Sequence, residues 1–516
     1  MQRNLILAVV LSSLVYIGWY SYLGKNLKPP AAGAQTAAAG AVTPGSPAPL
    51  AAGAAAPAPA SSAALPAADW KKSAAAISAG KAAYLFYPDA ASIKSVIYQG
   101  PVAPIELIPD AGQGFFASSL PYRFRLKART AGSLEFSADG PGGLTVTKKF
   151  VLSADGGINS FSMDITNKGR TPQILPAWEL TVGPGLGTAK SEEKENPKLW
   201  RAAYAFMETG RKHPSVKVLK DEPAQNDCVW AGVDNRYFLA ALAGGNLDKT
   251  RPLRREEKVG TNKAPLLAVP FAAEQLNPGE SRRWATSFYL GPKDYQRLQK
   301  LGMGLDRSVD FGFFSPLAKL ANSALTYFFR LTGNFGAAIV ILSVLIQLLL
   351  TPLSFKSYKA MAVMKKIQPE MQEIQKRYKD DPKRMNQEVM DLYKRHGTNP
   401  LGGCLPMLLQ IPVFFALFTA LRNSWTLHGA PFIFWIKDLS AKDPFYVLPL
   451  VMGGIMFLQQ HLSPQTADPA QAAMMKWMPL IFTFMFLSFP SGLVMYWLIN
   501  SIWGFAQNMY LKNKMA

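Results

Sequence analysis

No charged residue occurs between Trp477 and Leu511, and this apolar run limits what the chain can fold into. At about 1.5 Å per residue, a helix of that length would far exceed one crossing of a bilayer. The segment FPSGL at 489–493 breaks the run, which therefore predicts two membrane spans. Four further apolar runs bring the predicted number of spans to six: 4–23, 336–353, 401–421 and 445–461.

The first apolar run ends in bulky residues, YIGWYSYLG, whereas a cleaved signal peptide ends in small ones. Residues 1–24 are therefore predicted to be an uncleaved signal-anchor span, with cleavage in the following Ala-rich tract as the alternative. Residues 25–68 contain mainly Ala, Pro and Gly and few large apolar side chains. They cannot form a core, and we expect a disordered linker there.

Residues 69–300 show the alternation of apolar and polar residues that is typical of β-strands. It occurs in PYRFRLK (121–127), in SFSMDIT (160–166) and in RWATSFYL (283–290). Gly, Pro and Asn turns separate these segments, so we expect a large all-β sandwich. One helical interruption is predicted over 194–206.

Residues 313–330 change to a helical period. One predicted face is apolar: Phe313, Leu317, Leu320, Ala321, Ala324 and Phe328. The other is polar: Lys319, Asn322, Ser323, Thr326 and Arg330. An amphipathic helix directly before a span is expected to lie in the membrane interface. A packed soluble helix is the alternative.

A polar helical stretch over 356–398 interrupts the apolar core region, 336–511, with eleven Lys or Arg and six acidic residues. Its apolar residues keep a spacing of three and four, and KDDPKR at 379–384 supplies a turn, so it predicts an antiparallel helical hairpin. Charged residues near the turn are candidate contacts for a polar partner or anionic lipid: Lys376, Arg377, Asp380, Asp381, Lys383 and Arg384.

The Lys and Arg excess predicts the orientation, because such residues accumulate in cytoplasmic segments. The hairpin, Arg3, Lys476 and the last two lysines should be cytoplasmic. Counting crossings then places the β part outside and both termini inside. The prediction is a multi-pass membrane protein whose large β domain lies outside the cytoplasm.

Polar residues inside the predicted spans are candidate site residues, since such residues face a bundle interior or a wet cavity. Ser343 and Gln347 share a helix face, and Thr351 follows one turn later. The full candidate set for a substrate groove is Ser343, Gln347, Gln410, Tyr496, Trp497 and Asn500. Hydrogen bonding between helices is the alternative explanation, and it stays open at this point.

Enzymatic chemistry has little support in the sequence. The four histidines are scattered, and neither they nor the two cysteines, Cys228 and Cys404, have metal-ligand spacing. We predict no catalytic residue, no metal, no cofactor and no nucleic-acid specificity. A polytopic transporter or an intramembrane binding protein is the alternative function, although internal repeats and midplane charges typical of transporters are missing.

Three long segments carry a resemblance to a known family: NPLGGCLPMLLQIPVFFALFTALRNS (399–424), APFIFWIKDLSAKDPFYVLPLVMGGIMFLQQ (430–460) and FPSGLVMYWLIN (489–500). They resemble the YidC/Oxa/Alb family of membrane protein insertases, Gram-negative type. The resemblance implies a bacterial inner-membrane protein with a five-helix insertase core, a hydrophilic groove and a periplasmic β-supersandwich. It also implies nascent membrane proteins, the Sec translocon and the ribosome as partners, with the nascent chain or the ribosome at the charged turn of the hairpin, and a monomer as the working unit.

Two positions depart from the family pattern. The resemblance places Gln347 where the best-studied members carry a groove arginine, and Trp497 where a tyrosine is common. We therefore expect this chain to rely on the polarity of a groove more than on a fixed positive charge. The sequence also has no long basic segment after its last predicted span, so ribosome contact is expected at the hairpin and at 463–476.

Overall fold

The structure is a computed structural model that describes residues 70–398, 405–462 and 469–515. The predicted signal anchor (1–24), the linker (25–68), Cys404 and part of the 463–476 loop lie outside these residues. Residues 366–398 form a unit apart from the other described residues, so we describe them by themselves.

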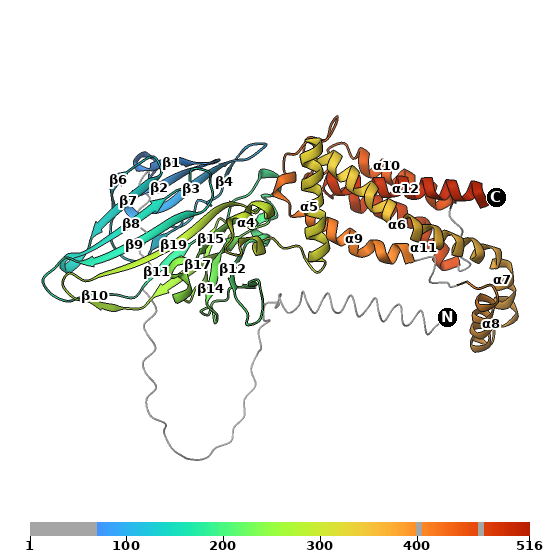
Figure 1. Cartoon of the computed structure of the whole chain (residues 1–516), viewed down its shortest axis with the longest axis horizontal. Helices are drawn as coiled ribbons and strands as arrows, with labels where there is room; N and C mark the ends of the chain where they lie inside the picture. Colours follow the sequence, from blue (N-terminus) through green and yellow to red (C-terminus); the bar gives the residue numbers. More distant parts are fainter. Residues whose placement is uncertain (1–69, 399–404, 463–468, 516) are drawn as a thin grey trace, which may run out of the picture. The chain divides into compact units, whose positions relative to one another are not determined.

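A nine-stranded antiparallel sheet dominates the first part of the described chain (Figure 1). Its order is β13-β12-β14-β15-β19-β9-β8-β7-β6. The strands are β6 (Arg125–Arg129), β7 (Ser133–Asp139), β8 (Leu144–Val151), β9 (Asn159–Asn167), β12 (Arg201–Phe206), β13 (Ser215–Val218), β14 (Cys228–Asp234), β15 (Phe238–Ala243) and β19 (Ser281–Pro292).

Three smaller antiparallel sheets accompany the large one, in the orders β1-β2-β3-β4, β16-β17-β11-β5 and β10-β18. Their strands are β1 (Ala75–Ala79), β2 (Ala82–Tyr87), β3 (Ser92–Gln99), β4 (Pro104–Glu106), β5 (Ala117–Ser118), β10 (Gln173–Leu175), β11 (Trp178–Val182), β16 (Leu253–Val259), β17 (Asn262–Phe271) and β18 (Glu274–Leu276). Aromatic side chains join the sheets: Phe86 of β2 meets Phe150 of β8 with ring centroids 4.9 Å apart.

The predicted β-rich part is confirmed, and two of the three alternating segments behave as expected. The apolar residues of SFSMDIT lie in β9 and are buried, and those of RWATSFYL lie in β19, where all except the half-buried Ala285 are buried. In PYRFRLK the prediction is wrong for Leu126, which is 41% exposed. It lies in the edge strand β6 next to a register shift, where nothing covers its outer face.

The predicted helix over 194–206 is wrong in its second half. Helix α3 covers only Asn196–Leu199, and β12 begins at Arg201. The run Ala202–Phe206 is buried at every position, so it has no alternating pattern to mark it as a strand. Short helices also occur elsewhere in the β part: α2 (Trp70–Ser73), α4 (Tyr295–Leu301), η1 (Pro88–Ala90), η2 (Pro141–Gly143), η3 (Lys190–Glu192), η4 (Gly245–Lys249) and η5 (Leu305–Ser308).

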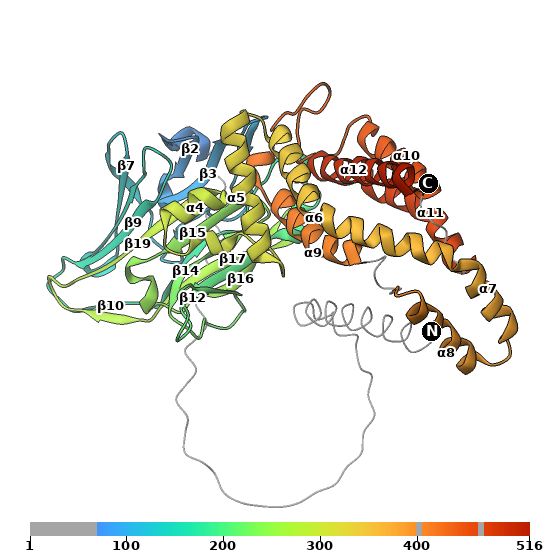
Figure 2. The same cartoon turned by 45° about the vertical axis from the view of Figure 1, so that its right-hand side comes forward.

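The second part of the chain is helical (Figures 1 and 2). Apart from 366–398, it contains α5 (Ser315–Thr332), α6 (Phe335–Lys366), α9 (Leu405–Arg422), η7 (Trp425–Leu427), α10 (Val447–Leu462), α11 (Pro469–Phe486) and α12 (Ser491–Met515). Within the described residues, only Phe335–Met364 of α6 is both long and apolar enough to cross a membrane; three other apolar segments are shorter. The six predicted spans stay a prediction.

The predicted break at FPSGL separates α11 from α12. Ser491 donates from its backbone N–H and its hydroxyl to the carbonyl of Ala441, at 2.7 Å each, and the Gly492 N–H donates to Leu439. A Cβ on Gly492 would approach Ile339 and the Leu439 carbonyl oxygen. The turn is therefore fixed to the segment between α9 and α10.

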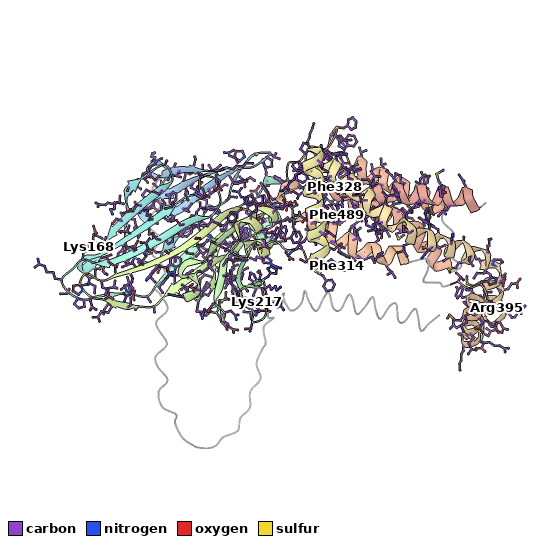
Figure 3. All side chains as sticks on the ribbon, viewed as in Figure 1. Lys168, Lys217, Phe314, Phe328, Arg395 and Phe489 are labelled. Carbon is purple, nitrogen blue, oxygen red and sulfur yellow. The ribbon has the colours of Figure 1, made fainter. Side chains whose placement is uncertain are left out.

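Helix α5 lies two residues later than the predicted 313–330, and its buried face differs from the predicted one. The buried residues are Ala318, Ala321 and Leu325, whereas Leu320 is 66% exposed. The small alanine side chains allow α9 to approach α5 closely. The face of α5 that packs is therefore the one with small side chains, and not the one with the most apolar residues. Figure 3 shows Phe314 and Phe328 toward opposite ends of α5.

The β part and the helices share one packed cluster. Strands β12, β14 and β15 are buried on both faces, and their second face meets α4, η5, Ala318 of α5 and Ala416 and Ala420 of α9. Two hydrogen bonds reinforce the contact. Thr419 donates to the Phe311 carbonyl at 3.1 Å, and Asn423 donates to the Asp310 carbonyl at 2.7 Å.

A buried ion triad holds the end of β19 near this contact. Asp234 accepts from Arg201 at 2.6 Å and from Lys293 at 2.8 Å, and Arg201 also donates to the Ser308 carbonyl of η5. Burial by itself raises the pKa of the Asp234 carboxyl, but the two cations hold that pKa below its usual value. Asp234 therefore stays ionised, whereas burial lowers the pKa of Lys293, and the triad ties β12, β14 and the end of β19 to η5.

The separate unit consists of α7 (Gln368–Arg377) and α8 (Pro382–Arg395). The start of α7 meets the end of α8, since the Tyr393 hydroxyl lies 3.3 Å from the Met371 sulfur. Asp381 caps α8 by accepting from the Arg384 N–H at 3.0 Å.

Lys148 of β8 is fully buried, and it gives a pH-dependent prediction. Its ammonium donates to the carbonyls of Ala90 and Phe116, and burial lowers its pKa to about 7. Between that value and the ordinary lysine pKa, the unfolded chain binds more protons, so stability rises with pH. From pH 7 to 9, wild type should gain about 2 kcal/mol, or several degrees in Tm, relative to Lys148→Met.

Thermal unfolding of both proteins at several pH values measures this difference. The exposed neighbour Lys149 is the matched control, because Lys149→Met removes the same charge without removing a buried amine. Parallel curves of Tm against pH for wild type and Lys148→Met would contradict the prediction.

Candidate functional site

The predicted site residues lie on three helices: Ser343 and Gln347 on α6, Gln410 on α9, and Tyr496, Trp497 and Asn500 on α12. The helices pack around an apolar cluster that includes Ile339, Leu417 and Val494. Any polar group placed inside this cluster needs a hydrogen-bond partner, because hydrocarbon supplies none.

Gln347 finds its partner on α12. Its Nε2 donates to Oδ1 of Asn500 at 2.7 Å, and the Gln347 side chain is only 8% exposed. The bond joins two helices 153 residues apart in the chain. A pair of amides is suited to this position, since each offers both a donor and an acceptor without carrying charge.

Further hydrogen bonds join α6 to α12 beyond Gln347. Thr351 lies one turn farther along α6, and its hydroxyl oxygen accepts from Gln507 at 2.9 Å and from Trp503 at 3.3 Å. That hydroxyl also donates to the Gln347 carbonyl at 2.7 Å. Trp503 was not among the predicted site residues, although its spacing of three from Asn500 and four from Gln507 places it on their face.

A second pair joins α9 to α12: Nε2 of Gln410 donates to the Tyr496 hydroxyl at 2.8 Å. Tyr496 is almost fully buried, with 1% exposed. Four of the six predicted residues therefore form two interhelical pairs, and both pairs use α12. We call Gln347, Thr351, Gln410, Tyr496, Asn500 and Gln507 the polar line.

The other two predicted residues have different surroundings. Ser343 is buried, and its hydroxyl donates to the Ile339 carbonyl of its own helix at 2.6 Å. Trp497 packs among aromatic rings, with centroids 5.0 Å from Phe414 and 5.3 Å from Phe486. The structure does not bring either residue into the hydrogen bonds of the polar line.

Two amide donors of α12 have no partner within the described residues. These are Nδ2 of Asn500 and Nδ2 of Asn508, and the Asn508 side chain is 8% exposed. An unsatisfied buried donor costs about 1–3 kcal/mol, so such groups call for a water molecule or another polar partner.

The predicted hairpin residues are all exposed in the separate unit. Lys376 and Arg377 end α7, Asp380 and Asp381 lie in the turn, and Lys383 and Arg384 begin α8. Arg384 also lies over the ring of Tyr378, 5.3 Å from its centroid. Exposed charges of both signs around one turn suit a polar partner or a solvated surface equally.

Metal chemistry has no candidate site in the described ranges, where no group of three His, Cys, Asp or Glu side chains could hold an ion. The free thiol of Cys228 is buried, and burial raises its pKa to about 12, so it is a poor nucleophile.

A β-rich domain, a membrane-length helix and a line of paired polar residues inside an apolar bundle together define a membrane protein with a large extramembranous part. Comparison with known families identifies which one. Residues 327–516 match the family described as 60Kd inner membrane protein, and residues 101–321 match the YidC periplasmic domain. The chain belongs to the YidC family, and is thus an inner-membrane protein with a periplasmic domain.

Curated relatives agree with the two family matches. A protein of Endomicrobium trichonymphae is 42% identical over 76% of each chain, and one of Geobacter sulfurreducens is 38% identical over 74% of this chain and 71% of its own. Both are named membrane protein insertase YidC. A crystal structure of an active YidC insertase aligns with 84% of this chain and 91% of its own, at 18% identity and a TM-score of 0.39. The family predicted from the sequence motifs is confirmed.

The Gln347–Asn500 bond gives a prediction for stability. In a double-mutant cycle with Gln347→Met and Asn500→Ala, the coupling free energy should be about 0.6 kcal/mol, the average for hydrogen bonds between membrane helices. Unfolding by SDS titration in mixed micelles measures it. A cycle of Gln347→Met with Thr483→Ala is the control, since Thr483 bonds the Pro479 carbonyl of its own helix. A coupling no larger than the control would contradict the pairing.

Proposed function

We propose that this chain is a membrane protein insertase that inserts inner-membrane proteins and assists their folding, without covalent chemistry or nucleotide hydrolysis. Membership of the YidC family supports the proposal, because its relatives carry that name. The same names favour an insertase over a polytopic transporter. The observation that carries the mechanism is the polar line, together with the two unpartnered amide donors of α12, Asn500 within the line and Asn508 beside it.

The polar line would act as the wall of a hydrated groove. Within the pairs, each amide side chain already makes one hydrogen bond. The free N–H donors of Asn500 and Asn508 favour water beside α12. A charged residue at the bilayer centre costs roughly 2.5–3.5 kcal/mol on insertion scales. A wet groove that extends partway through the bilayer would shorten the dry path for a hydrophilic segment, and the following apolar span would then leave sideways into lipid.

The proposed topology has six spans, cytoplasmic termini and the β domain in the periplasm, following the Lys and Arg excess. Helix α6 supports it: with 32 residues it is roughly 48 Å long, enough to cross the hydrocarbon core and continue beyond it. Figures 1 and 2 show α5 running across the direction of α9 and α12. This is the orientation of a helix that lies in the membrane interface. Its exposed apolar residues, Leu320, Tyr327 and Leu331, suit lipid, as does the exposed Phe313 just before the helix.

Helices α7 and α8 would form a cytoplasmic hairpin that receives the nascent chain. Their exposed charges near the turn, from Lys376 to Arg384, would contact a ribosome, a nascent chain or the anionic lipids of the inner leaflet. Cooperation with the Sec translocon belongs to the same proposal.

Gln347 replaces a fixed charge with a neutral amide, and this gives a prediction about substrates. Gln347→Arg should improve insertion of a substrate with an acidic periplasmic tail, because the charge would attract it, whereas Gln347→Ala should reduce insertion of all substrates several-fold. Reconstituted insertion into proteoliposomes measures both effects. If the arginine gave no gain and the alanine no loss, a role for groove polarity would be excluded.

Crosslinking tests the groove directly. A photoreactive amino acid at position 347 or 497, presented with ribosomes stalled on a short nascent span, should crosslink to that span. Leu348 is the matched control, because it neighbours Gln347 but is 51% exposed on the lipid side of the bundle. If neither position crosslinked in a folded protein, Gln347 would be a packing residue, and the proposed groove would be wrong.

A further inference from the structure

A cavity of about 460 Å³ lies where α4, α5 and the α9–α10 segment meet the β domain. Sites for small ligands typically have volumes of 300–1,000 Å³, so this one is large enough for a polar group of moderate size. Aromatic rings close part of it, including Tyr98 of β3 and Trp425 of η7, whose centroids are 6.0 Å apart.

The polar face of α5 lines this cavity. Asn322, Thr326 and Arg330 are four residues apart, so they share one helix face, and all three contribute to the lining. The sequence had marked this face as the solvated side of an amphipathic helix. In the structure it faces a partly open cavity beside the β domain, at which Arg330 itself is exposed, while Leu320, Tyr327 and Leu331 are exposed on other sides of α5.

The lining carries an excess of positive charge. It includes four basic residues, Lys81, Lys293, Arg297 and Arg330, and one acid, Asp294. The Lys293 ammonium is bound to Asp234 at 2.8 Å, and Asp294 is occupied in capping α4.

Three cations of the lining remain. Among the described residues, no ion pair with a carboxylate is formed by Lys81, Arg297 or Arg330, although Arg297 is close enough to Asp155 to help lower the pKa of that carboxyl. Arg297 donates to the Asp155 and Gly156 carbonyls, and Arg330 to the Gln296 side chain at 3.4 Å. Three cationic groups beside amides and hydroxyls are the surroundings that phosphate oxygens prefer.

We propose that this cavity binds a phosphate-bearing anion, with the headgroup of an anionic phospholipid as its source. The exposed apolar residues of α5 favour lipid as the source over a soluble phosphate, since acyl chains could lie along α5 while the headgroup enters the cavity. The site is separate from the polar line and does not rest on the insertase activity, so either can fail without the other.

Native mass spectrometry of the full-length protein in detergent tests the proposal, with phosphatidylglycerol and phosphatidylcholine as probes. Wild type should retain phosphatidylglycerol in preference. The double variant Lys81→Gln with Arg330→Gln should bind it at least about tenfold more weakly, because two cations near the headgroup are lost. Calorimetric titration with inorganic phosphate distinguishes a soluble anion from a lipid.

Controls separate the site from net charge and from folding. Lys300→Gln removes an exposed cation of α4 outside the lining and should leave lipid binding unchanged. The variant with Lys81→Arg and Arg330→Lys keeps both charges and should restore binding. Residue-dependent binding of either phosphatidylglycerol or phosphate supports the site and identifies its source. Equal binding by wild type and the double glutamine variant, or a preference for an acidic peptide over both probes, would overturn it.

Discussion

The need to satisfy polar groups inside an apolar bundle governs the helical part of this protein. Gln347 and Asn500 satisfy this requirement by a hydrogen bond to each other, and Thr351 and Gln507 form a second such bond farther along α6 and α12. Each bond has a specific partner, so it fixes how far along one helix the other must lie. An all-apolar interface would allow sliding, whereas these bonds select one register and leave two amide donors of α12 still in need of a partner.

The union of β domain and helices depends on small side chains. Ala203, Ala205 and Ala241 belong to the face of the large sheet that packs against the helices, and Ala318 and Ala416 approach it from α5 and α9. Bulkier residues on either side would hold the surfaces apart and expose the backbone carbonyls that Thr419 and Asn423 now bond. The contact is therefore both close and specific, and it holds α5 across the direction of α9 and α12 (Figure 2).

Sequence patterns predicted the family and the order of β-rich and helical parts, because both depend on long segments with strong periodicity. They also identified four of the paired residues, since an amide in an apolar run stands out. They could not say which amide meets which: partners such as Gln410 and Tyr496 lie 86 residues apart, and pairing depends on helix rotation. The buried strand β12 and the packed face of α5 were missed because both are rich in alanine. Alanine occurs at buried and at exposed positions, so its pattern does not predict which face is buried. The cavity lined by Lys81 and Arg330 could not be foreseen, since its residues come from distant segments.

Trp425 has a consequence for the order in which the protein is made. Its ring belongs to the hydrophobic core of the β domain, where it meets Phe238 of β15 with centroids 4.8 Å apart. Yet it is synthesised long after the last strand of that domain, in the segment between α9 and α10. A newly translated β domain must therefore exist for a time with this aromatic place unfilled, and its core is complete only after α9 has been made. Completion of the outer domain thus depends on synthesis of the helical part. A chain interrupted before α9 would lack Trp425 in the core of its outer domain, unlike a finished chain.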